Sequence, residues 1–84
     1  MEPKFKFYEV VRIVAQPPRV QEILVNKEGI IDGMSEPGED NVRYYGVFVN
    51  EFGEGFGVPE NLLESTGRFA SPKDIKSRSR AKGR

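Results

Sequence analysis

The stretch RYYGVFVNEFGEGFGVPENLLESTG, residues 43–67, decides the fold. It contains two runs rich in β-branched and aromatic residues, and the glycine-rich segment 50–55 lies between them. Glycine adopts the positive φ values that tight chain reversals need, so this segment predicts a turn between two antiparallel strands. Pro59 has no N–H to donate and ends the second strand. The stretch therefore predicts a β-hairpin.

The first strand of this hairpin has two faces, because successive side chains of a strand point to opposite sides. One face carries Tyr45, Val47 and Val49, and the other carries Tyr44 and Phe48. The apolar character of the first set predicts that it packs into the core.

An earlier strand is predicted at Phe7–Val14 (FYEVVRIV), which is rich in β-branched and aromatic residues and short for a helix. Val11 and Ile13 lie on either side of Arg12, which predicts that the valine and isoleucine face the core. The competing register would bury the arginine at a high cost, so we prefer the first register.

A long connection, Ala15–Lys27 (AQPPRVQEILVNK), follows this strand. Two adjacent prolines exclude regular helix and sheet at its start, and loops of this length in compact domains are often functional. The segment 20–25 (VQEILV) predicts either a turn of helix or a short strand. Its apolar side chains are expected to fold back onto the core, because a small protein exposes them only at a cost. These side chains are Val20, Ile23, Leu24 and Val25.

The remaining elements are short. Gly29–Ser35 predicts a strand in which Gly33 marks a bulge or a bend, and Ser35–Asn41 predicts a loop. Pro59 and the residues after it favour one 3₁₀ or α turn, and Glu64–Phe69 predicts a last strand.

Charge divides the chain. Residues 1–72 hold 7 Lys and Arg against 12 Asp and Glu, whereas residues 73–84 hold 6 basic residues and one acid. From Ser71 onward the composition cannot bury enough surface to offset chain entropy, which predicts a disordered basic tail. We therefore expect one domain over residues 1–70 and a tail over residues 71–84. No aromatic residue is interleaved with the arginines of the tail, which weakens its reading as a nucleic-acid-binding arm.

Five short β segments, a long first connection and tight later turns together predict an all-β fold. The order of the elements is that of an SH3-like small barrel of about five antiparallel strands, with one short helical turn before the last strand. Closure would cover most strand edges of a chain with little core. An open β meander capped by residues 20–25 is the alternative.

The residue types that are absent limit the chemistry. The chain has no cysteine and no histidine, so it lacks thiolate zinc ligands, the commonest general base and the usual partner of a nucleophilic serine. We therefore expect no enzymatic activity, no cofactor and no metal site. No apolar run approaches the ~20 residues that span a bilayer, and residues 1–7 lack the apolar core of a secretory signal, so a cytoplasmic location is expected.

Three motifs contain residue types that can carry chemistry. GEGFG at residues 53–57 superficially resembles a phosphate-binding loop, but no helix follows it, so the hairpin interpretation is better. The acids of residues 32–40 lack calcium-loop spacing and predict a solvated acidic loop. Ser65 and Thr66 have no histidine to activate them and are expected to bond to nearby backbone.

The chain resembles the bacterial immunity-protein family numbered thirty-one in polymorphic-toxin systems. The resemblance rests on FYEVVRI at 7–13, EGIIDGMSE at 28–36, YYGVFV at 44–49 and GFGVPENLLESTGR at 55–68. Members commonly have tryptophan near the position of Phe56, and this sequence has none. The resemblance implies an antidote that binds a toxin made by the same or a neighbouring cell and blocks it.

An acidic and aromatic face would suit a toxin that carries basic groups, as a nuclease toxin does for phosphate. The residues predicted to bind the partner are Tyr44, Glu51, Phe52, Glu54 and Glu60. The alternative function is an SH3-like module that associates with nucleic acid or the ribosome through the basic tail. The acidic body argues against nucleic acid elsewhere on the protein, and no membrane partner is expected. The sequence leaves the oligomeric state open.

Overall fold

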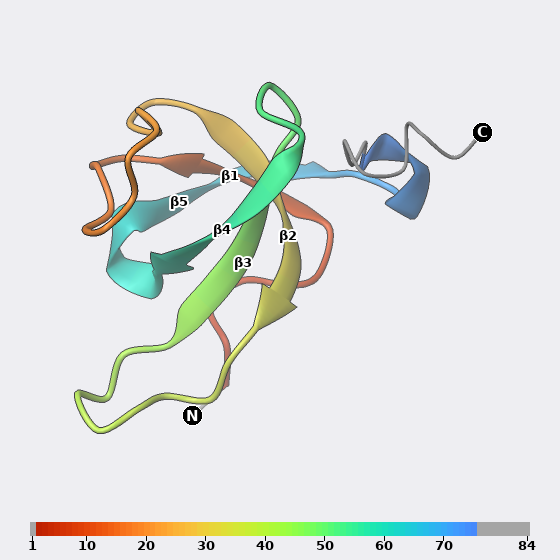
Figure 1. Ribbon diagram of the computed structural model, residues 1–84. Helices are drawn as coiled ribbons and strands as arrows, with labels where there is room; N and C mark the ends of the chain where they lie inside the picture. The colour runs from red at the N-terminus through yellow and green to blue at the C-terminus, as the bar shows by residue number, and fades with distance from the viewer. Residues whose placement is uncertain (1, 76–84) are drawn as a thin grey trace.

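The computed structural model describes residues 2–75 of the 84-residue chain as one five-stranded antiparallel sheet (Figure 1). The strands lie in the order β4-β3-β2-β1-β5. Their bounds are β1 Glu9–Ile13, β2 Glu28–Met34, β3 Tyr44–Val49, β4 Glu54–Pro59 and β5 Leu63–Phe69. Two 3₁₀ turns, η1 (Glu60–Leu62) and η2 (Pro72–Asp74), come before and after β5. The predicted small SH3-like all-β fold, with a helical turn before the last strand, is confirmed.

The twisted sheet wraps around its own core, with β1 and β5 lying behind β2, β3 and β4 in the view of Figure 1. Val11 and Ile13 are fully buried, whereas the side chain of Arg12 between them is 40% exposed. This burial pattern confirms the register predicted for β1. The predicted core face of β3 is buried as well, and its residues are Tyr45, Val47 and Val49.

Strand β2 contains the bulge that Gly33 predicted. Ile31 pairs with Val47 and Gly33 pairs with Gly46, so Asp32 is the extra residue between two pairs that are adjacent on β3. A bulge bends its strand and changes the direction of the side chain that it carries. Here it places Asp32 on the outer face of the sheet, beside β3.

The connection between β1 and β2 contains neither of the elements predicted for residues 20–25. The side chain of Gln16 organises it instead: its Oε1 accepts a hydrogen bond from Leu24 N (2.8 Å), and its Nε2 donates to the carbonyls of Val20 and Glu22. Leu24 is fully buried, as predicted. The prediction for Ile23 is wrong, since this side chain is 63% exposed: a loop held by one glutamine amide orients only some of its apolar side chains inward.

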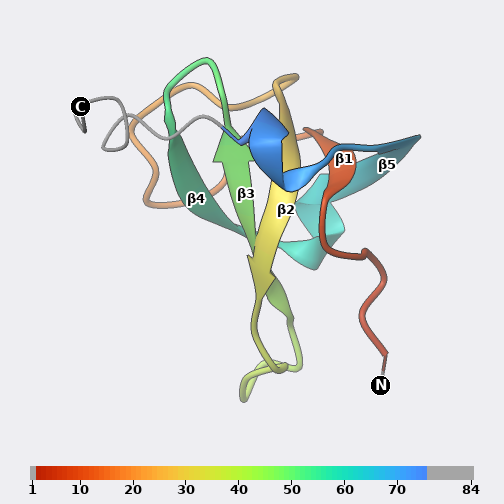
Figure 2. The same ribbon diagram turned by 90° about the vertical axis from the view of Figure 1, so that its right-hand side faces the viewer.

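Part of the outer face of the sheet is also covered. Phe48, on the outer face of β3, is only 5% exposed, and it pairs with Ile30, which is 6% exposed. The chain after β5 returns to this side of the sheet, as Figure 2 shows for η2. Asn50 Nδ2 donates a 2.9 Å hydrogen bond to the carbonyl of Asp74 and fixes η2 at the β3–β4 turn. Residues 72–74 of the predicted tail thus form a 3₁₀ turn, and residues 76–84 lie outside the described residues.

We predict that alanine substitution destabilises the protein at one glycine of the sheet and has almost no effect at another. A Cβ on Gly29 would lie 2.5 Å from Val47 Cγ1 and 2.8 Å from the carbonyl oxygen of Phe48, so Gly29→Ala forces a packed strand to move. We expect it to lower the free energy of unfolding by about 1–3 kcal/mol. A Cβ on Gly57 would meet nothing within 4 Å, so Gly57→Ala should stay within about 0.5 kcal/mol of the parent. Urea unfolding measures both, and equal effects would contradict this packing.

Candidate functional site

The five residues predicted to bind a partner lie at the two ends of the β3–β4 hairpin. Val49 pairs with Glu54 at the turn, whereas Tyr44 pairs with Pro59 at the other end, five residues along β3. At about 3.4 Å per residue, roughly 17 Å separates the two ends. The structure therefore brings Glu51, Phe52 and Glu54 together at the turn and places Tyr44 and Glu60 at the far end.

Glu60 belongs to an internal network. Tyr45 is 1% exposed, and its hydroxyl donates a 2.5 Å hydrogen bond to Glu60 Oε2. The same hydroxyl accepts from the backbone N–H groups of Lys4 and Phe5, and Lys4 N also donates to Glu60. The bond from Tyr45 holds the pKa of Glu60 below its ordinary value, and burial raises the pKa of Tyr45. Glu60 thus holds the N-terminal segment onto the hairpin.

Two of the three turn residues also have partners within the protein. Glu51 forms an ion pair with Lys27 at 2.8 Å, which offsets its charge. The ring of Phe52 packs against the core and lies edge-on to Phe56, with 5.9 Å between the ring centroids. Glu54 is exposed, and no ion pair to it is formed within residues 2–75. Tyr44 and Glu54 are therefore the two predicted residues that remain available to a partner.

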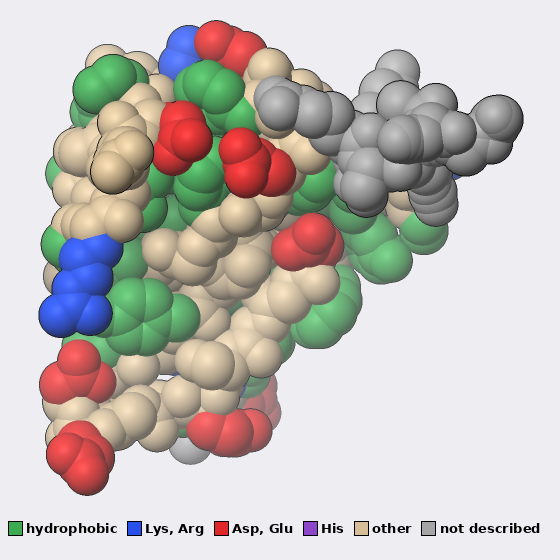
Figure 3. Space-filling view, in the orientation of Figure 1, with side chains coloured by type: hydrophobic (Ala, Val, Ile, Leu, Met, Phe, Trp, Pro, Cys, Tyr) green, Lys and Arg blue, Asp and Glu red, His purple; other side chains and the backbone are tan. Residues whose placement is uncertain are grey.

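Three glycines lie next to one another on the outer face of the hairpin, so this part of the face has no side chains. In three successive cross-strand pairs this face carries Phe48 and Gly55, Gly46 and Gly57, and Tyr44 and Pro59. We call Gly46, Gly55 and Gly57 the glycine floor. In Figure 3, the middle of the face that β3 and β4 present is drawn in tan, the colour of backbone and uncharged polar side chains, and acidic side chains lie around it.

Asp32, which the β2 bulge turns outward, lies over the glycine floor. Its Oδ1 is 2.9 Å from the position of a Cβ on Gly46, and its Oδ2 is 4.0 Å from that of a Cβ on Gly55. A Cβ on Gly46 would force the carboxylate to move, whereas a Cβ on Gly55 would only contact it at an ordinary van der Waals distance. Partial burial raises the pKa of Asp32, and a hydrogen bond from its own backbone N–H acts in the opposite direction. No cation within residues 2–75 forms an ion pair with it.

A cavity of about 500 Å³ adjoins the glycine floor. It lies between the β1–β2 connection and the hairpin, and its lining residues are Pro18, Arg19, Val20, Tyr44 and Gly57. Tyr44 is 42% exposed and forms the wall that the cavity shares with the floor. Such a mixture of an aromatic ring, apolar walls and a few polar groups is typical of a recognition site. We call the cavity, the glycine floor and Asp32 together the hairpin face.

Sequence reasoning missed Asp32 and the cavity. The signals were present, since glycines at 46, 55 and 57 leave gaps in two strands and Gly33 predicted the neighbouring bulge. What the sequence does not contain is the pairing register, which sets the glycines side by side and aims Asp32 at them.

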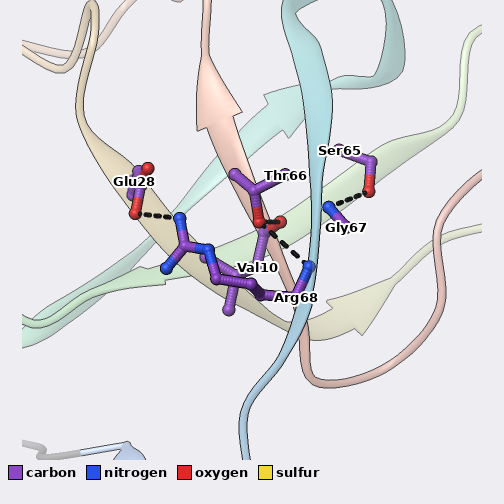
Figure 4. Close-up of polar contacts among 6 residues, drawn as sticks. All are labelled: Val10, Glu28, Ser65, Thr66, Gly67 and Arg68. Carbon is purple, nitrogen blue, oxygen red and sulfur yellow. Dashed lines mark hydrogen bonds and ion pairs between the residues drawn. The ribbon is translucent and has the colours of Figure 1, made fainter.

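Ser65 and Thr66 bond to nearby backbone, as predicted (Figure 4). Thr66 Oγ1 donates to the carbonyl of Val10 at 2.8 Å, and Ser65 Oγ accepts from Gly67 N at 3.1 Å. These contacts stabilise a bulge in β5, where Val10 pairs with Arg68 and the next residue, Val11, pairs with Ser65. Both hydroxyls therefore serve the fold.

Residues 2–75 contain no group of three or more histidine, cysteine or acidic side chains placed to hold a metal ion. Within the same residues, neither 3₁₀ turn has the length or the apolar character of a membrane-crossing helix. Comparison of the chain with protein-family models, with curated proteins and with solved structures finds no match. The resemblance to the immunity-protein family remains a prediction.

We predict that Tyr45→Phe lowers the free energy of unfolding by about 1–3 kcal/mol, because the backbone N–H of Phe5 loses its acceptor and Glu60 loses the hydroxyl that donates to it. Tyr44→Phe, which removes an exposed hydroxyl one residue away, is the matched control and should have little effect. Chemical unfolding of both variants measures the difference.

The effect of Tyr45→Phe should depend on pH. The lowered pKa of Glu60 means that its contribution is present above the unfolded value of about 4.3 and is lost as pH falls through the folded value. The raised pKa of Tyr45 means that its contribution is lost as pH rises through a folded value above about 10. The stability difference between parent and variant should therefore be largest from about pH 5 to pH 9 and shrink on both sides. A difference that does not change with pH would contradict the assigned network.

Proposed function

We propose that this chain is a non-enzymatic binding protein that recognises a basic protein partner through the hairpin face. More specifically, we propose an immunity protein that neutralises a cognate bacterial toxin, acting in the cytoplasm. The observation that carries the proposal is the position of Tyr44, exposed between a cavity of about 500 Å³ and a glycine floor under the carboxylate of Asp32. The family-like motifs of the sequence support it independently.

The geometry suits the insertion of a side chain from the partner. The glycine floor lets another molecule approach the backbone of β3 and β4 closely, because no side chain stands in the way. A lysine or arginine placed there would meet the carboxylate of Asp32 and the ring of Tyr44, through a charged hydrogen bond and a cation–π contact.

Electrostatics supports a basic partner as well. Residues 1–72 hold five more acidic than basic residues, and two exposed acids lie at the hairpin face: Glu54 on β4 and Asp32 on the neighbouring strand β2. A face of this sign attracts a basic surface and accelerates encounter. Compared with the sequence-based expectation, Asp32 replaces Glu51 and Glu60 as a source of charge, since those two glutamates have partners within the protein.

The test uses the full chain and a purified candidate toxin domain, for which the neighbouring genes are the first place to search. We expect Tyr44→Ala to weaken binding at least tenfold, because exposed aromatic residues at such sites dominate binding energy. Asp32→Asn should slow association and reduce its salt dependence. Titration calorimetry measures affinity, stopped-flow fluorescence measures association, and survival of cells that express the toxin measures neutralisation.

Matched controls lie on β5, at the other edge of the sheet. Phe69→Ala removes an aromatic ring that is 60% exposed, and Glu64→Gln removes an exposed carboxylate. Both should bind the toxin like the parent. If Tyr44→Ala and Phe69→Ala bind equally well, the hairpin face is not the binding site.

A further inference from the structure

Strand β4 is an edge of the sheet and pairs with β3 alone (Figure 2). In an antiparallel pair every second residue exchanges backbone hydrogen bonds with the other strand, and the residues between point their N–H and C=O groups away from it. The bond from Glu60 N to the carbonyl of Arg43, 2.9 Å long, continues the β3–β4 register and sets this alternation. Gly55 and Gly57 therefore direct their N–H and C=O groups away from β3.

The pairing of β3 with β2 gives the same alternation. Ser35 N donates to the carbonyl of Tyr44 at 2.9 Å, so Tyr44 and Gly46 point their backbone groups to β2 and the residues next to them point theirs to β4. Within residues 2–75, neither the loops nor the side chains provide a hydrogen bond to the backbone of Gly55 or Gly57. The free side of β4 thus has donors and acceptors that another chain can use.

The two edges of the sheet differ in their protection against an added strand. Edge strands of native proteins are usually protected by bulges and charged side chains. Strand β5 has both, namely a register shift between the pairs of Val10 and Val11 and the exposed side chains of Glu64 and Arg68. Strand β4 pairs with β3 without a register shift, and its residues 55–58 (GFGV) contain no charge. The edge that can accept a strand is therefore β4.

The cavity of the hairpin face adjoins this edge. Gly57 belongs to its lining, and the β1–β2 connection lines it with Pro18, Arg19 and Val20. Gly55 and Gly57 are both exposed, and a backbone without side chains lets another chain approach closely. A strand that pairs with Gly57 therefore enters the cavity.

We propose that an extended segment of the partner adds to the edge of β4 as an antiparallel strand and bonds to the backbone of Gly55 and Gly57. In this mode of peptide recognition, main-chain hydrogen bonds supply affinity and alternate side chains supply specificity. The proposal rests on the proposed recognition of a basic partner by the hairpin face, and it adds the form in which that partner binds.

The surroundings of β4 specify the side chains of the added segment, because residues that pair across strands share a face of the sheet. The residue opposite Gly55 lies on the outer face, where Asp32 Oδ2 is 4.0 Å from the position of a Cβ on Gly55. A lysine or arginine there forms a charged hydrogen bond with Asp32. The residue opposite Phe56 lies on the inner face, where Phe56 packs against the core, so an apolar residue suits it.

The residue opposite Gly57 faces Arg19 across the cavity, and a neutral residue there avoids repulsion. An antiparallel strand runs against the direction of β4, so it meets Gly57 before Gly55. Read from its N-terminus, the predicted segment therefore has the order neutral, apolar, basic.

The first experiment titrates the full chain into a fluorescein-labelled peptide of sequence GTVTVKVTG, whose lysine is placed to lie opposite Gly55, and records fluorescence anisotropy. We expect a dissociation constant below about 1 mM. N-methylation of the threonine two residues before the lysine removes an N–H that points to β4, and should weaken binding at least about tenfold. N-methylation of the valine between them removes an N–H that points away from β4, and is the matched control.

A pair of variants tests the same contact from the side of the protein. Gly57→Pro removes the free N–H but no bond to β3, at a position where an edge strand tolerates proline. It should weaken binding of the peptide at least about tenfold, whereas Gly57→Ala keeps the N–H and should bind like the parent. Circular dichroism verifies that both variants are folded.

Amide hydrogen exchange of the parent chain tests the edge without a substitution. In the free chain the amides of Gly55 and Gly57 should exchange quickly and those of Phe56 and Val58 slowly, because only the second pair bonds to β3. Saturation with the peptide should slow exchange at Gly55 and Gly57.

Three results would overturn the proposal: no peptide binding up to about 1 mM, equal effects of the two N-methylations, or unchanged exchange at Gly57 in the complex. A dimer of the chain that Gly57→Pro abolishes would also overturn it and assign the edge to a second copy. If Tyr44→Ala weakens binding of the toxin domain and Gly57→Pro does not, recognition by the hairpin face stands and strand addition fails. If only Gly57→Pro weakens it, strand addition stands and the role of Tyr44 fails.

Discussion

The side chain of Tyr45 connects the hydrophobic core, the N-terminal segment and the 3₁₀ turn η1. Its ring lies in the core, edge-on to Phe5 at 5.3 Å, while its oxygen joins the N-terminal segment to Glu60 at the start of η1. A buried hydroxyl without hydrogen-bond partners costs free energy. The ring of Tyr45 can therefore be buried only where its hydroxyl also reaches its partners. The inner face of the hairpin is thereby fully committed to the fold. Any recognition by the hairpin has to use its outer face or its free edge.

That outer face combines features that suit recognition. The hairpin face combines Asp32, Tyr44 and a side-chain-free floor, and it suits a basic group that approaches the backbone closely. The net charge of zero conceals the excess of five acidic over basic residues in residues 1–72.

The sequence was sufficient to predict which side chains are buried where burial alternates along a strand. In β1 it predicted that Val11 and Ile13 are buried, because only one register keeps Arg12 in solvent. The sequence was insufficient to predict which charged side chains have partners, where the partner is distant in the chain. Glu51 pairs with Lys27, 24 residues away, and Glu60 with Tyr45, 15 residues away, and counting charges reveals neither contact. Asp32 was missed because a bulge, which Gly33 did predict, changes the direction of the side chain by an amount that only the pairing register defines.

The most direct test of the hairpin face maps contacts without substitutions. Backbone amide resonances of the isotopically labelled full chain are recorded while an unlabelled candidate toxin domain is added. The account predicts that the largest shifts occur at Tyr44, Gly46 and Gly57 and at the cavity wall around Arg19, with little change in β5. Shifts confined to β1 and β5, with the glycine floor unperturbed, would contradict it.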